Sequence, residues 1–270
     1  MNTKLNFMNE HVTGARLRKL TTAVYEMGHN SSHVHMIMAA KIVYVKTDFW
    51  ERVLNTMAKR TKPCVLISHN SDIGIDSRMW RYRTDNVVKW YAENVMYKHP
   101  DLVPIPLGCE NMRSPGYSGN MGIVDRVVRM REKPRKFVYL NCNPNTNSAV
   151  RGPLVEKFKD KDWVTYDPYG IQFEDCLKQL KAHTFVFCPT GNGLDTHRFS
   201  EAVYLGAIPI VLRSHMYECW SDDIPIVMVD SWDEVTQEML NDWLAVFKTQ
   251  QFNYNCMKMS YWTKRIRAWR

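Results

Sequence analysis

Short apolar runs alternate with stretches of helical periodicity along most of the chain. Runs of β-branched and aromatic residues are each followed by a polar turn and then by apolar positions three and four residues apart. This alternation is typical of parallel strands connected by helices. The predicted strands are KIVYV (41–45), CVLIS (64–68), VPIPLG (103–108), FVYLN (137–141), WVTYD (163–167), TFVFC (184–188) and IPIVL (208–212).

The intervening segments predict helices and divide the chain into two halves. Helices are expected over FWERVLNTMAKR (49–60), 86–92, 151–158, 173–182 and SYWTKRIRAW (260–269). Pro and Gly in NMRSPGYSG (111–119) disrupt both regular periods and predict a loop. The pattern predicts an α/β fold of two Rossmann-like lobes with parallel sheets. We place the N-lobe at 1–118, the C-lobe at 134–250, and a final helix within 251–270 that can cross back to the N-lobe.

Length and composition fit a globular protein. The 270 residues are 45% hydrophobic, enough for one large or two small cores. The longest apolar stretch, HVHMIMAAKIVYV (33–45), contains His35 and Lys41 and is shorter than the roughly 20 residues of a membrane span. We therefore expect no membrane span. The N-terminal residues lack the pattern of a secretory signal, and the seven cysteines lack zinc-ligand spacing, so we expect reduced thiols and a cytoplasmic location.

Positive charge suggests an anionic partner. The formal net charge is +8, and basic residues cluster in RVVRMREKPRK (126–136) and KRIRAWR (264–270). Neither cluster contains a nucleic-acid-binding motif. A solvated face or an anionic small substrate is therefore favoured over nucleic acid as the partner.

The most informative segment is CPTGNGLDTHRFSEAVYLGAIPIVL (188–212). Gly191 and Gly193 lie between a predicted buried strand and a predicted helix. Glycine permits positive φ and a close approach of the backbone to a ligand. Free amides at the start of that helix, with Asp195 or Thr196 as the cap, favour phosphate or another anion.

The helix that follows has two faces. An apolar stripe is expected to face the core: Phe199, Ala202, Val203 and Gly206. His197, Arg198 and Glu201 share the opposite edge. Arginine can donate paired hydrogen bonds to a diphosphate, and a carboxylate one turn later can accept both hydroxyls of a ribose. The alternative is an ion pair at i and i+3 on an exposed helix.

The segment GNGLDTHRFSEAVYLGAIPIV (191–211) resembles the nucleotide-binding segment of exostosin-like glycosyltransferases, which have the two-lobed GT-B fold. Further blocks are similar in the same order: ISHNSD (67–72), WYAENV (90–95), IPLGCEN (105–111), NPNTNSAVRGPLV (143–155) and YWTKRI (261–266). Within this family, the Met- and Trp-rich sequence is similar to xylosyltransferases of large algal viruses, which would place the protein in the host cytoplasm.

The resemblance implies an inverting, metal-independent transferase without a cofactor. It would move a sugar, with xylose suspected, from a UDP-sugar donor to an oligosaccharide or glycoprotein glycan acceptor. The donor residues carried over are Thr190, Gly191, Asn192 and Gly193 with Thr196 and His197 around the phosphates, Arg198 and Arg151 on the diphosphate, Glu201 on the ribose, and Tyr166 and Tyr169 near uracil. Alternatives stay open: a surface position for Arg151, and core packing for the two tyrosines.

An inverting transfer also needs a general base that removes the proton of the acceptor hydroxyl. Asp72 is the leading candidate, because it follows a predicted strand at the end where open α/β sheets place ligand-binding loops. His69 is a second candidate for the interlobe cleft, and Asp76 is the reserve. The alternative is local hydrogen bonding within a polar turn.

The acidic pair in DKD (160–162) has the spacing of a metal site in the other large glycosyltransferase fold. It lies in the charged stretch KFKDKDW, for which a solvated connection is the favoured interpretation, so no metal is expected. A different class of function also remains open. The chain can be a non-catalytic module that binds a nucleotide or nucleic acid and transfers nothing.

Overall fold

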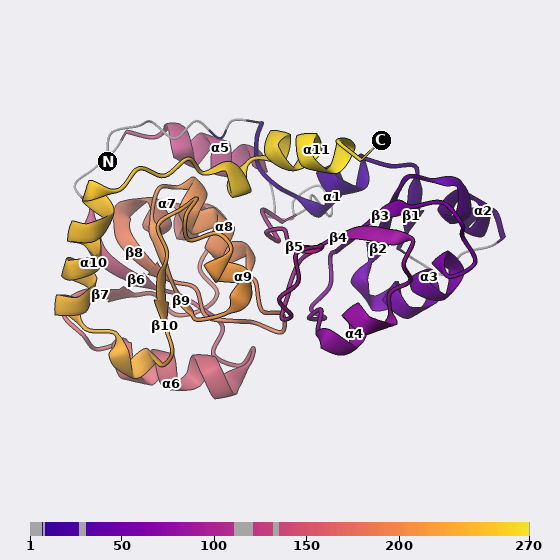
Figure 1. Ribbon diagram of the computed structural model, residues 1–270. Helices are drawn as coiled ribbons and strands as arrows, with labels where there is room; N and C mark the ends of the chain where they lie inside the picture. The colour runs from indigo at the N-terminus through magenta and orange to yellow at the C-terminus, as the bar shows by residue number, and fades with distance from the viewer. Residues whose placement is uncertain (1–6, 8, 27–30, 111–120, 132–134, 270) are drawn as a thin grey trace.

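The computed structural model describes residues 7, 9–26, 31–110, 121–131 and 135–269. These residues form two lobes, each built on a five-stranded parallel sheet (Figure 1). The predicted α/β fold with two Rossmann-like lobes is therefore confirmed. None of the helices in these ranges is both long and apolar enough to cross a membrane.

The N-lobe sheet has the strictly sequential order β1-β2-β3-β4-β5. Its strands are β1 (Ala23–Tyr25), β2 (Ile42–Lys46), β3 (Cys64–His69), β4 (Val87–Ala92) and β5 (Leu102–Pro104). The first four strands are connected by α2 (Ser31–Ala39), η1 (Thr47–Phe49), α3 (Trp50–Met57) and α4 (Ser77–Tyr82). Right-handed crossovers that all advance in one direction place their helices on one face of the sheet. Val43, Val45 and Leu66 accordingly pack with residues of α3 and α4 in one core cluster.

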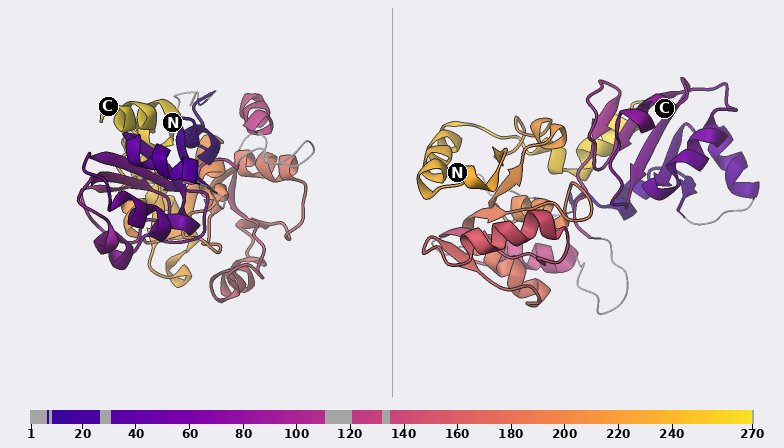
Figure 2. Two further views of the ribbon diagram at one scale, coloured as in Figure 1. Left: turned by 90° about the vertical axis from the view of Figure 1, so that its right-hand side faces the viewer. Right: turned by 90° about the horizontal axis from the view of Figure 1, so that it is seen from below.

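The opposite face of the N-lobe sheet is covered by α1 (Gly14–Arg18) and by α11 (Met259–Arg267). Strand residues that alternate with the first set, such as Tyr44 and Ile67, share a second cluster with Leu17, Trp262 and Ile266. Figures 1 and 2 show α11, in yellow at the end of the chain, lying beside the N-lobe. The expected return of the C-terminal helix to the N-lobe is confirmed, and α11 buries a face that the sequential crossovers leave open.

The C-lobe sheet has the order β10-β9-β8-β6-β7. Its strands are β6 (Lys136–Leu140), β7 (Val164–Tyr166), β8 (His183–Phe187), β9 (Ile208–Leu212) and β10 (Val227–Val229). The helical elements are α5 (Met121–Arg129), α6 (Ser148–Phe158), α7 (Phe173–Ala182), α8 (His197–Tyr204), α9 (His215–Glu218), η2 (Trp232–Glu234), α10 (Gln237–Thr249) and η3 (Asn255–Met257). Residues of α6 and α10 pack on one face, and residues of α5, α7 and α8 pack on the other. The order reverses between β6 and β8, and such switch points hold ligands at the carboxyl ends of the strands.

The strand predicted over 103–108 ends at Pro104 in the structure, and one predicted helix is wrong. Residues 86–92, expected to be helical, contain β4, which pairs with both β3 and β5 in the middle of the N-lobe sheet. Valine, tryptophan and tyrosine favour a pleated, packed surface, and Trp90 and Tyr91 are buried on opposite faces of this strand. Pairing on both sides outweighs the weak helical spacing of the segment.

The two lobes share one hydrophobic core cluster. The Tyr204 hydroxyl of α8 accepts the Val12 amide at 2.8 Å and donates to the Met257 carbonyl at 2.9 Å, which joins α8 to both ends of the chain. Helix α5 packs on α7. The predicted loop 111–119 lies outside the described residues, and 132–134, just before the predicted start of the C-lobe, lie outside them as well.

Candidate functional site

Arg198 lies at the switch point of the C-lobe sheet. Its guanidinium donates to the Asn141 carbonyl at 2.8 Å and to the Asn141 side-chain oxygen at 3.3 Å. Asn141 directly follows β6. Its own amide donates to the carbonyls of Asp167 and Pro168, which follow β7, at 2.9 and 3.0 Å. The start of α8 and the loop after β7 are thus held together by one side chain.

Arg151 approaches the same place from α6. Its Nε donates to the Thr190 carbonyl at 2.9 Å, and its terminal nitrogens lie 3.4 Å from the Asn143 carbonyl and 3.3 Å from the Pro189 carbonyl. The arginine therefore connects the segments that follow β6 and β8. It is half-buried, so it does not occupy the exposed surface position that was the alternative interpretation.

The two arginines make the switch point electropositive. Burial lowers the pKa of Arg151, and the positive charge of Arg198 lowers it further. Glu201 lies 3.6 Å from the Arg198 guanidinium and only 7% of its side chain is exposed. No carboxylate in the described part of the chain lies within ion-pair distance of Arg151. The pair Arg198–Glu201 exists, but on a largely buried helix rather than on the exposed helix of the alternative interpretation.

Gly191 and Gly193 allow neighbouring residues to pack closely against the turn, and their backbone angles are ordinary. Gly191 and Gly193 do not use the positive φ that glycine permits, because the positive-φ glycines of the described residues lie elsewhere. A Cβ on Gly191 would lie 3.0 Å from the Arg151 guanidinium. A Cβ on Gly193 would lie 3.0 Å from the Asn94 amide nitrogen and 3.3 Å from Asp72 Cα. The turn is therefore in direct contact with the N-lobe.

The start of α8 differs from the expected cap. Thr196 is the N-cap residue, yet its hydroxyl makes no hydrogen bond within the described residues. The Asp195 carboxylate accepts the Thr196 amide and the Leu107 amide, each at 2.8 Å, and so links α8 to the N-lobe. His197 Nδ1 lies 2.7 Å from the Gly108 carbonyl, so this ring nitrogen carries the proton and donates. His197 and Asp195 both engage the segment after β5.

The remaining donor candidates line the edges of this region. The Thr190 hydroxyl accepts the Asn147 amide at 3.0 Å, and Asn192 is exposed in the turn. Tyr166 is partly buried against the C-lobe core, as the packing alternative expected. Tyr169 is 65% exposed and follows the loop that Asn141 holds.

The candidate bases have different environments. Asp72 is exposed, and its backbone lies against Gly193 at the boundary of the lobes. Asp76 caps α4 by accepting the Met79 amide at 2.8 Å, which is a local structural role. His69 is fully buried, so the expectation that its ring faces a cleft is wrong. Burial lowers the pKa of His69, and its Nε2 lies 3.2 Å from the Pro106 carbonyl.

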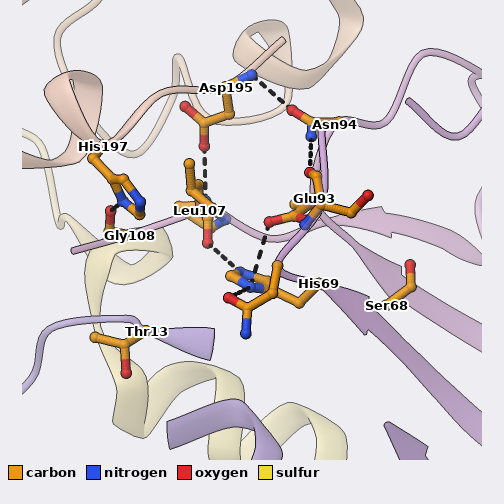
Figure 3. A network of polar contacts seen from close by, with 12 residues as sticks. Thr13, Ser68, His69, Glu93, Asn94, Leu107, Gly108, Asp195 and His197 are labelled. Carbon is orange, nitrogen blue, oxygen red and sulfur yellow. Dashed lines mark hydrogen bonds and ion pairs between the residues drawn. The ribbon is translucent and has the colours of Figure 1, made fainter. Parts of the chain in front are cut away.

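Glu93 is a titratable residue at this boundary that was not singled out from the sequence. It directly follows β4, is 0% exposed, and its carboxylate accepts the Ser71 amide. The second carboxylate oxygen lies 3.4 Å from His69 Nδ1 (Figure 3). Burial raises the pKa of Glu93 to about 8. A neutral glutamic acid next to a neutral histidine is therefore the stable arrangement near neutral pH.

Asn94 was also missed, and it connects the two lobes directly. Its amide donates to the Ser71 carbonyl at 2.9 Å, and its side-chain oxygen accepts the Asp195 amide at 2.7 Å (Figure 3). Its backbone has φ +51°, a left-handed conformation that asparagine tolerates. Reading WYA as the end of a strand would have indicated both residues, because polar side chains there lie at the ligand-binding edge of a parallel sheet.

The DKD sequence (160–162) is exposed and lies between α6 and β7. Within the described residues no three His, Cys, Asp or Glu side chains are grouped closely enough to hold a metal ion.

Comparison with known proteins adds little. No protein-family model and no curated protein matches the chain. Among solved structures, a chain of the GtfA/B complex is similar, with a TM-score of 0.38 and 11% identity. The match covers 84% of this chain and 55% of that chain, so it spans little more than half of the neighbour's length. A similarity this distant gives no argument about function.

Proposed function

We propose that the protein is a glycosyltransferase that binds a nucleoside diphosphate sugar at the switch point of the C-lobe. The observation that carries the proposal is the convergence of Arg151 and Arg198 on the carboxyl ends of β6 and β8. A diphosphate would neutralise a positive charge that Glu201 balances only in part. Charge-assisted hydrogen bonds of this kind are about twice as strong as neutral ones.

The finer assignment follows the resemblance to exostosin-like glycosyltransferases. The donor is a UDP-sugar, with xylose as the sugar, and the acceptor is an oligosaccharide or glycoprotein glycan. Glu201 binds the ribose, and uracil lies along the loop from Tyr166 to Tyr169. Asn141 supports this placement, because it holds that loop beside Arg198.

Asp72 is the proposed general base for an inverting, metal-independent transfer. It would accept the proton of the acceptor hydroxyl as the oxygen attacks the anomeric carbon and UDP leaves from the opposite face. Contact of its backbone with Gly193 supports the proposal, because the acceptor side and the donor turn then meet at one place. His69 is buried away from this surface, so it is not proposed as the base.

A donor screen tests the proposal. UDP release is measured with each common UDP-sugar and a glycan acceptor, in the presence and absence of EDTA. We expect release with UDP-xylose that EDTA does not reduce. Calorimetry with UDP and an RNA oligomer covers the alternative. Tight binding of the oligomer with no response to UDP would replace the proposal with a non-catalytic nucleic-acid-binding module.

A further inference from the structure

The turn that carries Asp72 is held by two consecutive side chains. The Glu93 carboxylate accepts the amide of Ser71, and the Asn94 amide donates to the carbonyl of Ser71 at 2.9 Å. Both backbone polar groups of the residue before Asp72 are therefore fixed from the end of β4. An exposed turn held at both polar groups has less freedom than its exposure suggests.

Asn94 also holds the donor segment. Its side-chain oxygen accepts the Asp195 amide at 2.7 Å, three residues before Arg198. The Asp195 carboxylate continues the link by accepting the Leu107 amide at 2.8 Å. Figure 3 shows Asn94 between Glu93 and Asp195, with its amide and oxygen pointing in opposite directions.

We propose that Asn94 is a positioning residue that sets the spacing between the acceptor-side carboxylate, Asp72, and the donor-binding helix α8. The role rests on the proposed transferase function. The catalytic carboxylate and the donor lie on different lobes, and one side chain contacts the segment that carries each of them. A misplacement of reacting groups by about 1 Å can reduce a rate on the order of 100-fold, so loss of this link affects the chemical step more than donor binding.

Asn94→Gly is the decisive variant. Glycine adopts positive φ without strain, so the variant removes both side-chain hydrogen bonds and retains the backbone conformation. Asn9→Gly is the matched control, because Asn9 also has positive φ, at +62°, and its carbonyl contact with Arg16 is unaffected by the change. Thermal unfolding of both variants tests whether they remain folded.

Three measurements decide the proposal. In Asn94→Gly we expect the Asp195 amide to exchange with solvent on the order of tenfold faster, and kcat to fall 10-fold or more, while the Kd for UDP stays within twofold. Unchanged exchange and kcat would overturn the proposal, and so would a loss of UDP affinity that matches the loss of kcat. A wild-type protein that binds no UDP refutes the transferase function instead, and the exchange rate still decides whether Asn94 links the lobes.

Discussion

Replacing Glu93 with glutamine changes how the stability of the protein depends on pH. The carboxyl group is fully buried, and its pKa rises from 4.5 to about 8. Between these values the folded protein keeps the proton and the unfolded chain releases it. The site therefore contributes full stability below about pH 4.5, and this contribution is lost as the pH rises through 8.

The magnitude follows from the pKa. Each pKa unit corresponds to about 1.4 kcal/mol, so the full shift of the Glu93 pKa contributes at most about 5 kcal/mol to the free energy of unfolding. From pH 5.5 to 7.5 the free energy of unfolding of the wild type should fall by about 2 to 3 kcal/mol relative to Glu93→Gln. Buried groups that do not interact with Glu93, such as His183, are common to both proteins and cancel in the comparison, whereas Asp195, whose pKa burial raises to about 6, is also affected by the charge of Glu93.

Urea unfolding across this pH range measures the difference, and Glu156→Gln, at an exposed position on α6, is the control. Parallel curves for wild type and Glu93→Gln would show that burial does not raise the pKa of Glu93. A difference of opposite sign would show that Glu93 and His69 form a charged pair instead of a neutral one.

Three further substitutions, two of them with matched controls, test other parts of the structure. Gly193→Ala places a Cβ 3.3 Å from Asp72 Cα and should lower the stability measured by thermal unfolding on the order of 1 kcal/mol. The control Gly152→Ala, in open space on α6, should raise the stability by about 0.5 to 1 kcal/mol. Asp72→Asn should retain UDP binding and abolish sugar transfer, and unchanged turnover would remove Asp72 from the mechanism. Trp262→Ala should lower the free energy of unfolding by about 3 to 5 kcal/mol, because α11 covers the N-lobe sheet. The control Trp269→Ala, at an exposed position, should lower it by less than about 1 kcal/mol. Equal effects would show that α11 is not part of the core.

The strands that are buried on both faces were predictable from sequence, because their apolar runs are short and bounded by turns. CVLIS and IPIVL correspond to β3 and β9. Strand β4 was not predictable from sequence, since the segment 86–92 contains polar and charged residues. Its strand pairing comes from distant neighbours. The order of strands in each sheet is likewise a property of tertiary contacts, and no local pattern specifies it.

The residues of the candidate site also divide into those that local sequence indicates and those that only the tertiary structure reveals. The Gly-rich turn and Arg198 were identified as candidates from sequence because glycine and arginine have recognisable roles before a helix. Glu93 and Asn94 were missed, because their positions matter only once β4 is a strand that ends beside β3. His69 was a candidate for the interlobe cleft, yet it lies at the buried end of β3.

Calorimetric titration of UDP into three proteins tests the proposed nucleoside diphosphate site most directly. These are the wild type, Arg198→Ala, and the control Arg213→Ala, which removes an exposed arginine paired with Asp230. A hydrogen bond to a charged group contributes about 1.5 to 3 kcal/mol, so Arg198→Ala should bind UDP roughly 10- to 150-fold more weakly, and Arg213→Ala like the wild type. Equal affinities for all three proteins, or no binding by the wild type, would contradict a nucleoside diphosphate site at the switch point of the C-lobe.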